Sequence, residues 1–149
     1  MSNEITVRNL LQITAGNVKY STPKDAANFT LDMVGRRGPT PGLMRVTVDG
    51  VDADLSLLDT PGVGDITNLS EVTGNWIEYG IYDQDYERFY PLGKVNPGQT
   101  WPIQFSPNMF GEFSSGGGTG TGTSGPSNNT LRFRSRLEDC DVVLSAFEA

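Results

Sequence analysis

The stretch LLDTPGVGD contains the motif Asp-Thr-Pro-Gly at residues 59–62, a form found in GTP-hydrolysing switch proteins. Nucleotide hydrolysis also requires a phosphate loop, Gly-x-x-x-x-Gly-Lys-Ser/Thr, whose backbone amides and lysine hold the phosphates. The only Gly-Lys pair, at 93–94, has Arg88 where the loop needs its first glycine and Val95 where it needs a hydroxyl. Because a Pro-Gly pair between strands is typical of a type II turn, we interpret the motif as a turn and expect no nucleotide to bind.

A second candidate for chemistry is the acidic sequence DQDYE, in which Asp83, Asp85 and Glu87 alternate as at the start of a calcium loop. Such a loop needs glycine at its sixth position and glutamate at its twelfth, and Arg88 and Lys94 stand there instead. We interpret this stretch as a solvated hairpin tip. A weak, non-standard calcium site near Asp83 and Asp85 is the alternative.

The remaining residue types argue against catalysis. Histidine is absent, which excludes Ser-His-Asp and Cys-His catalysis and every imidazole metal site. The Gly-x-Gly-x-x-Gly pattern at 120–125 is followed by Pro126, whereas a dinucleotide fingerprint requires a helix there. The dispersed acidic residues define no catalytic carboxylate pair. We therefore expect a protein that is not an enzyme and has no cofactor and no metal beyond that alternative.

Three arginines alternate with other residues near the C-terminus: Arg132, Arg134 and Arg136. On a strand this spacing places three guanidinium groups in a row on one face. The planar guanidinium suits carboxylate and phosphate partners, so the row is a candidate docking stripe for an acidic partner or a nucleic-acid backbone. The alternative is a solvated strand face paired with acidic residues of the neighbouring strand.

Alternation of apolar and polar residues with period two predicts that strands position these groups. The clearest example is a predicted hairpin in which the runs 44–48 and 51–57 flank the turn pair Asp49-Gly50. In WPIQFS, we expect Trp101, Ile103 and Phe105 to face the core, and Pro102 to place this strand at a sheet edge. The final strand, CDVVLSAFE, is apolar on both faces and is therefore predicted to be central. No amphipathic helix is evident, so the expected fold is all-β: an antiparallel β-sandwich or barrel of jelly-roll type.

A segment rich in glycine, serine and threonine, Ser114 to Asn129, interrupts the strands and is poor in apolar groups. We expect a flexible loop within a single β-sandwich domain that spans residues 1–149, and not a boundary between two domains. A loop of this length is often functional, so it is a second candidate for protein interaction. The loop residues proposed to contact partners are Ser114, Gly117, Gly120 and Gly125.

Composition limits the partners. The chain has 149 residues, a net charge of −7 and a pI near 4.4, so direct contact with nucleic acid is not expected. A single cysteine, Cys140, suits a reducing compartment or assembly inside a cell. Neither a signal peptide nor an apolar run of membrane-spanning length is visible, so no membrane contact is expected.

The region Ile66 to Pro107 resembles small all-β structural proteins of tailed bacteriophages and prophages. The shared pattern is Asn-Leu, a strand ending in Glu-x-Gly, an aromatic-rich strand, and Lys-x-x-Pro-Gly before another apolar strand. In this chain these elements are Asn68-Leu69, Glu78 to Gly80, Phe89-Tyr90-Pro91 and Lys94 to Gly98.

The resemblance implies a virion component that is assembled in the host cytoplasm. We expect a capsid decoration or cement-type protein that forms homo-oligomers and binds other virion proteins, the major capsid protein first among them. A neck or tail component is one alternative. A carbohydrate-binding β-sandwich that uses the aromatic residues Trp76, Tyr82, Tyr86 and Trp101 is another.

Overall fold

The computed structural model describes residues 4–23, 28–32, 39–106 and 129–148. Within these ranges the chain forms twelve strands and no helix, and hence no helix that could cross a membrane. The prediction of an all-β fold is therefore confirmed. The proposed loop residues Ser114, Gly117, Gly120 and Gly125 lie outside the described residues.

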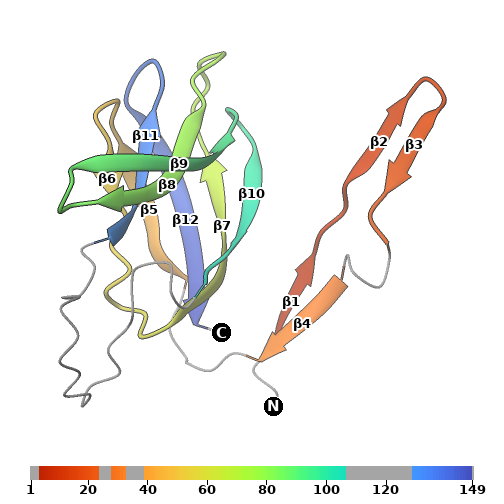
Figure 1. Ribbon diagram of the computed structural model, residues 1–149, viewed down its shortest axis with the longest axis horizontal. Helices are drawn as coiled ribbons and strands as arrows, with labels where there is room; N and C mark the ends of the chain where they lie inside the picture. The colour runs from red at the N-terminus through yellow and green to blue at the C-terminus, as the bar shows by residue number, and fades with distance from the viewer. Residues whose placement is uncertain (1–3, 24–27, 33–38, 107–128, 149) are drawn as a thin grey trace.

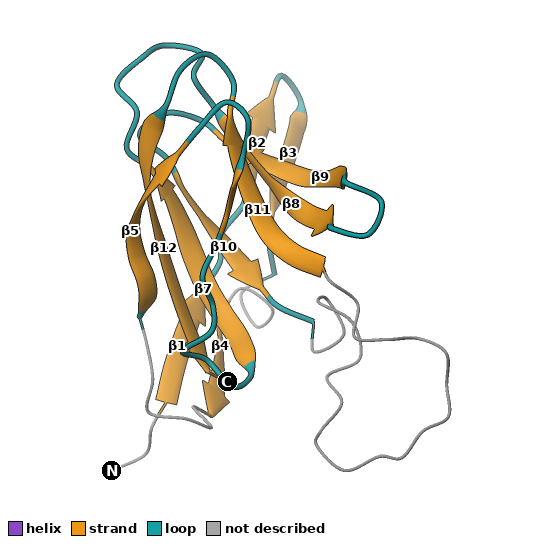
Figure 2. Ribbon diagram, turned by 90° about the vertical axis from the view of Figure 1, so that its left-hand side faces the viewer, coloured by secondary structure: helices purple, strands orange, loops and turns teal. Residues whose placement is uncertain are grey.

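Two four-stranded antiparallel sheets form the body of the protein (Figures 1 and 2). The first has the order β10-β7-β12-β5, with bounds Thr100–Gln104, Pro61–Asn68, Cys140–Glu148 and Thr40–Val46. The second has the order β6-β11-β8-β9, with bounds Val51–Asp52, Asn129–Ser135, Ile77–Asp83 and Arg88–Val95.

The sheets pack as a sandwich because each strand turns one apolar row inward. In β12 every second residue is buried, from Cys140 to Glu148, while the residues between them are half-buried. The shared core joins Ile66 and Leu144 of the first sheet to Ile77, Leu131 and Phe133 of the second. Burial of a large apolar side chain stabilises a fold by roughly 1.5–3 kcal/mol, so this cluster is the main source of stability.

Two strand positions agree with the sequence predictions. β10 is an edge strand. Proline has no amide proton to donate, and on the outer side of an edge strand Pro102 does not need one. β12 lies between β7 and β5, so the last strand is central as predicted.

The predicted hairpin around Asp49-Gly50 is wrong. Gly50 does occupy a turn, with φ 106° and its amide donating to the Thr47 carbonyl over 3.2 Å. The chain then crosses between sheets, because β5 pairs with β12 whereas β6 pairs with β11. Alternation predicts which face of a strand is buried but not which of the two sheets the strand joins, because both sheets of a sandwich have an apolar face.

The interpretation of residues 59–62 as a type II turn is also wrong. Pro61 and Gly62 are the first residues of β7, where a missing amide proton costs little. The chain bends one step earlier, and the Asp59 amide donates to the Glu148 carboxylate over 2.8 Å.

Four N-terminal strands lie outside both large sheets. β1 (Glu4–Arg8) pairs with β4 (Asn28–Asp32), and β2 (Gln12–Ala15) pairs with β3 (Val18–Ser21). β2 and β3 make their main contacts with each other, and Figure 1 shows this hairpin well apart from the sandwich.

Candidate functional site

The three arginines lie on the outer face of the second sheet, as predicted. β11 buries Leu131, Phe133 and Ser135 in the sandwich, so the alternate positions 132, 134 and 136 point outward.

Two of the three arginines are paired with acidic residues of neighbouring strands. Arg132 Nε lies 2.5 Å from Asp52 Oδ1, and Arg134 Nε lies 2.6 Å from Glu78 Oε2. The hydrogen bond to Asp52 raises the pKa of the Arg132 guanidinium above its ordinary value, against the opposing effect of burial. For these two residues the alternative that the sequence left open, a strand face paired with acidic neighbours, describes the structure.

Aromatic rings lie beneath all three arginines. The guanidinium carbons are 3.3 Å from the Tyr82 ring centroid for Arg132, 4.8 Å from Phe89 for Arg134 and 3.8 Å from Trp76 for Arg136. Such cation–π contacts contribute about 0.5–2 kcal/mol each, according to how far they are desolvated. They hold the long arginine side chains flat against the sheet.

Arg136 differs from the other two because no carboxylate of the described residues lies within ion-pair distance of it. It shares the Trp76 ring with Lys94, whose Nζ is 4.6 Å from the same centroid. The strand order β11-β8-β9 places these two cations on either side of the strand that Trp76 precedes. Positive charge is therefore concentrated at this end of the row, in a protein whose net charge is −7.

A cavity of about 320 Å³ opens at the same end of the row. Its lining combines two cations, one acid, an aromatic ring and an exposed aliphatic side chain: Val48, Trp76, Glu78, Arg134, Ser135 and Arg136. The hydroxyl of Ser135 is buried and has no hydrogen-bond partner among the described residues.

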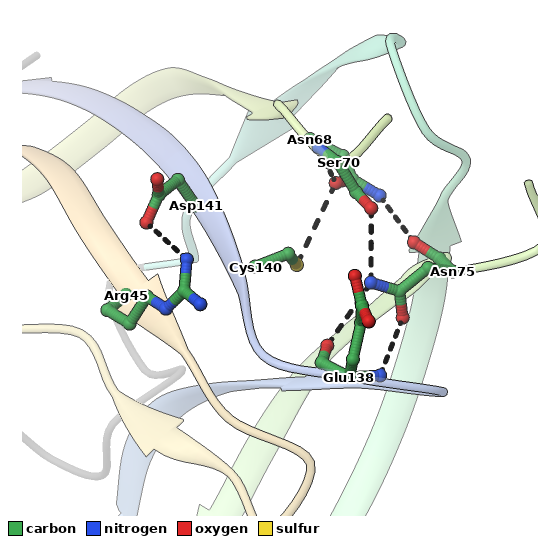
Figure 3. Close-up of polar contacts among 7 residues, drawn as sticks. All are labelled: Arg45, Asn68, Ser70, Asn75, Glu138, Cys140 and Asp141. Carbon is green, nitrogen blue, oxygen red and sulfur yellow. Dashed lines mark hydrogen bonds and ion pairs between the residues drawn. The ribbon is translucent and has the colours of Figure 1, made fainter. Parts of the chain in front are cut away.

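A network of buried asparagines fixes the backbone at this cavity (Figure 3). Asn75 is fully buried, and its Nδ2 donates to Ser70 Oγ and to the Glu138 carbonyl, each over 3.1 Å. Its Oδ1 accepts from the Leu137 amide at 2.9 Å. The next residue, Trp76, accepts at its carbonyl from the Arg136 amide over 3.1 Å. Asn75 thus connects the start of β8 to the segment that follows β11.

Asn68 extends this network into the first sheet. Its Nδ2 donates to the carbonyls of Asn75 and Val95, and its Oδ1 accepts from the Ser70 amide. The Cys140 thiol lies 3.9 Å from that oxygen, and burial raises the pKa of the thiol. From the sequence, Asn68 is named only as part of the Asn-Leu motif, and Asn75 is not singled out. Trp76 is not predicted as a ring that binds cations, because no local pattern shows which strands meet.

The acidic stretch 83–87 forms the turn between β8 and β9, so the predicted hairpin tip is confirmed. Asp83 Oδ1 accepts from the amides of Asp85 and Tyr86, at 3.0 and 3.3 Å, and so closes the turn. No group of three or more potential metal ligands occurs in the part of the chain that the structure describes.

The other aromatic candidates do not form a common surface. Tyr86 is 78% exposed on the 83–87 turn of the second sheet, whereas Trp101 is 52% exposed on the edge strand of the first. The prediction that Trp101 is a core residue is wrong. It pairs with Ile66 on the inward side, but no further strand among the described residues lies beside β10 to cover the indole.

The β2–β3 hairpin presents a second candidate surface. The register pairs Ile13 with Tyr20 and Ala15 with Val18, which places these four side chains on one face. All of them are exposed, and Leu11, at the base of the hairpin, is 54% exposed. Sequence analysis missed this hairpin, although two alternating runs around Gly16-Asn17 are a recognised hairpin signal.

Comparison with known proteins adds no relative: no family model matches the sequence, and no curated protein or solved structure matches it either.

Proposed function

We propose that this chain is a non-enzymatic structural subunit of a tailed-phage virion, a decoration-type capsid protein that binds other protein subunits. Its partners are other virion proteins, with the major capsid protein first, and further copies of itself. A place in the neck or tail is the alternative setting, since similar surfaces serve in a ring.

The observation that carries this proposal is the bare apolar face of the β2–β3 hairpin. Ile13, Val18 and Tyr20 are each at least 45% exposed and lie side by side. An isolated two-stranded hairpin is only marginally stable in water, and contiguous exposed apolar surface marks sites of protein interaction. A projecting hairpin of this composition is therefore suited to pack against another subunit.

The virion setting is supported by the resemblance of Ile66 to Pro107 to phage structural proteins. In the fold this region supplies the last three residues of β7 and all of β8, β9 and β10, so it contributes to both sheets. The resemblance therefore concerns residues that build the sandwich and not an appendage.

The carbohydrate-binding alternative has less support. Sugar binding of this type requires aromatic faces that are free to stack, and the rings of Tyr82 and Trp76 already lie against guanidinium groups. Tyr86 and Trp101 are exposed but lie on different sheets.

Reconstitution tests the proposal. Phage particles made from the encoding genome without this coding sequence are mixed with the purified chain, and bound protein is measured after sedimentation. Wild type should bind, and Ile13→Asp, which places a charge on the apolar face, should bind at least about tenfold more weakly because interface hot spots exceed 1.4 kcal/mol.

Thr14→Asp is the matched control, because it adds the same charge to the opposite face of the same hairpin. Failure of wild type to bind any particle would remove the virion setting. Equal binding by Ile13→Asp and Thr14→Asp would show that the hairpin is not the interface.

A further inference from the structure

We propose that the cavity beside Trp76 and Arg136 is a binding site for the carboxylate of an acidic peptide segment, with Arg136 as the group that binds it. The inference rests on the proposed function, in that the segment belongs to another protein subunit.

The charge of Arg136 favours an anionic ligand. Arg132 and Arg134 are each matched by a carboxylate of the same sheet, whereas Arg136 has none among the described residues. A guanidinium presents five N–H donors in a planar fork that fits a carboxylate with two parallel hydrogen bonds. Stacking on Trp76 at 3.8 Å occupies a face of the guanidinium and leaves its edge for a ligand.

Hydrogen bonds hold the lining of the cavity in place without a ligand. The Asn75 hydrogen bonds fix the backbone at Trp76, and the Trp76 carbonyl in turn accepts from the Arg136 amide. Glu78 holds the Arg134 side chain at the wall of the cavity. Since these groups are held in place before the ligand arrives, binding does not have to pay the entropy of ordering several long side chains.

The size and the lining of the cavity indicate the class of ligand. The volume of about 320 Å³ corresponds to roughly ten water molecules, which is enough for one or two side chains of a peptide. Val48 adds an exposed aliphatic surface, which favours a peptide in which an apolar residue follows the acid. Glu78 in the same wall and the net charge of −7 disfavour a polyphosphate backbone.

The test uses a blocked peptide of sequence Asp-Leu-Asp-Leu, with Asn-Leu-Asn-Leu as its neutral counterpart, titrated into the full chain. The readout is the indole N–H signal of Trp76 in a nitrogen–proton correlation spectrum, assigned with Trp101→Phe because the chain has only two tryptophans. The acidic peptide should bind, and the neutral one should bind at least about tenfold more weakly, as expected for loss of a charge-assisted hydrogen bond.

Arg136→Gln should lower the affinity for the acidic peptide by a similar factor. The matched control is Arg45→Gln, which removes another exposed arginine, paired with Asp141 on the other sheet, and should leave the affinity unchanged. A urea titration of each variant confirms that it is folded.

Absence of binding at millimolar peptide, equal binding of the neutral peptide, or full affinity in Arg136→Gln would each overturn the proposal. A thymidine decanucleotide that displaces the peptide and binds more tightly would overturn the choice of an acidic peptide in favour of nucleic acid. Ile13→Asp separates the two proposals, because it should weaken particle binding at least about tenfold and leave peptide binding intact. If Arg136→Gln still binds particles and the wild-type chain binds no peptide, the cavity site is refuted but the proposed function is not.

Discussion

Replacement of Asn75 by alanine tests the role of the buried network directly. The substitution removes two donated bonds, to Ser70 Oγ and the Glu138 carbonyl, and two accepted bonds, from the Leu137 amide and, over 3.4 Å, from the Glu138 amide. A buried polar group left without a partner costs about 1–3 kcal/mol. Residues 137 and 138 are exposed, so water can replace the bonds that their backbone loses, whereas the buried Ser70 hydroxyl is less accessible to water. We therefore expect the free energy of unfolding to fall by about 2–4 kcal/mol.

The assay is urea unfolding followed by tryptophan fluorescence. With an m-value of about 1–3 kcal/mol per molar, a loss of about 3 kcal/mol lowers the midpoint by on the order of 1–3 M. Asn96→Ala is the control, because the Asn96 amide makes only one exposed side-chain bond, to Gln99 over 3.2 Å. It should cost less than about 1 kcal/mol. If Asn75→Ala and Asn96→Ala unfold at the same urea concentration, the Asn75 bonds do not stabilise the connection between the start of β8 and the segment after β11.

Two further predictions concern a close approach of strands and a buried thiol. A Cβ added at Gly80 would lie 2.0 Å from the Tyr90 carbonyl oxygen, so Gly80→Ala should lower the free energy of unfolding by about 3 kcal/mol. Gly98→Ala, which meets no atom within 4 Å but has φ 73°, should cost only about 1–2 kcal/mol in the same urea assay. Burial raises the pKa of the Cys140 thiol, so native protein should react slowly with a thiol reagent at pH 8 and faster once unfolded. As the pH rises above about 8.5, the thiol ionises in the unfolded chain before it does in the folded protein, so the free energy of unfolding should fall from there upward. Cys140→Ala should lessen that fall. A dependence of the unfolding free energy on pH that is the same in Cys140→Ala and wild type would contradict this.

The sequence predicted features that depend on local alternation. The arginine row is an example: residues 132, 134 and 136 share a face in any strand, whatever its neighbours. The edge position of β10 followed from Pro102, and the central position of β12 followed from apolar residues on both of its faces.

The sequence could not predict features that depend on which strands meet. The Asp49-Gly50 turn leads into a different sheet because both apolar faces can bury in the same core. The Asn75 network and the Trp76–Arg136 stack arise only when β8 pairs with β11. Trp101 alternates like a core residue, and its exposure comes from the absence of a strand beyond β10 among the described residues.

The central position of β12 has a consequence for how the chain folds. β12 completes the first sheet by pairing with β5, and the contact between Arg45 and Asp141 joins residues 96 positions apart. A fold dominated by such distant pairings acquires its native contacts slowly, on a scale of milliseconds to seconds. Until β12 is in place, β5 and β7 each lack a neighbour, and such unpaired strand edges are templates for association with other chains. A fragment that ends before Cys140 should therefore aggregate rather than form half of a sandwich, and refolding of the whole chain should give more soluble protein as its concentration is lowered.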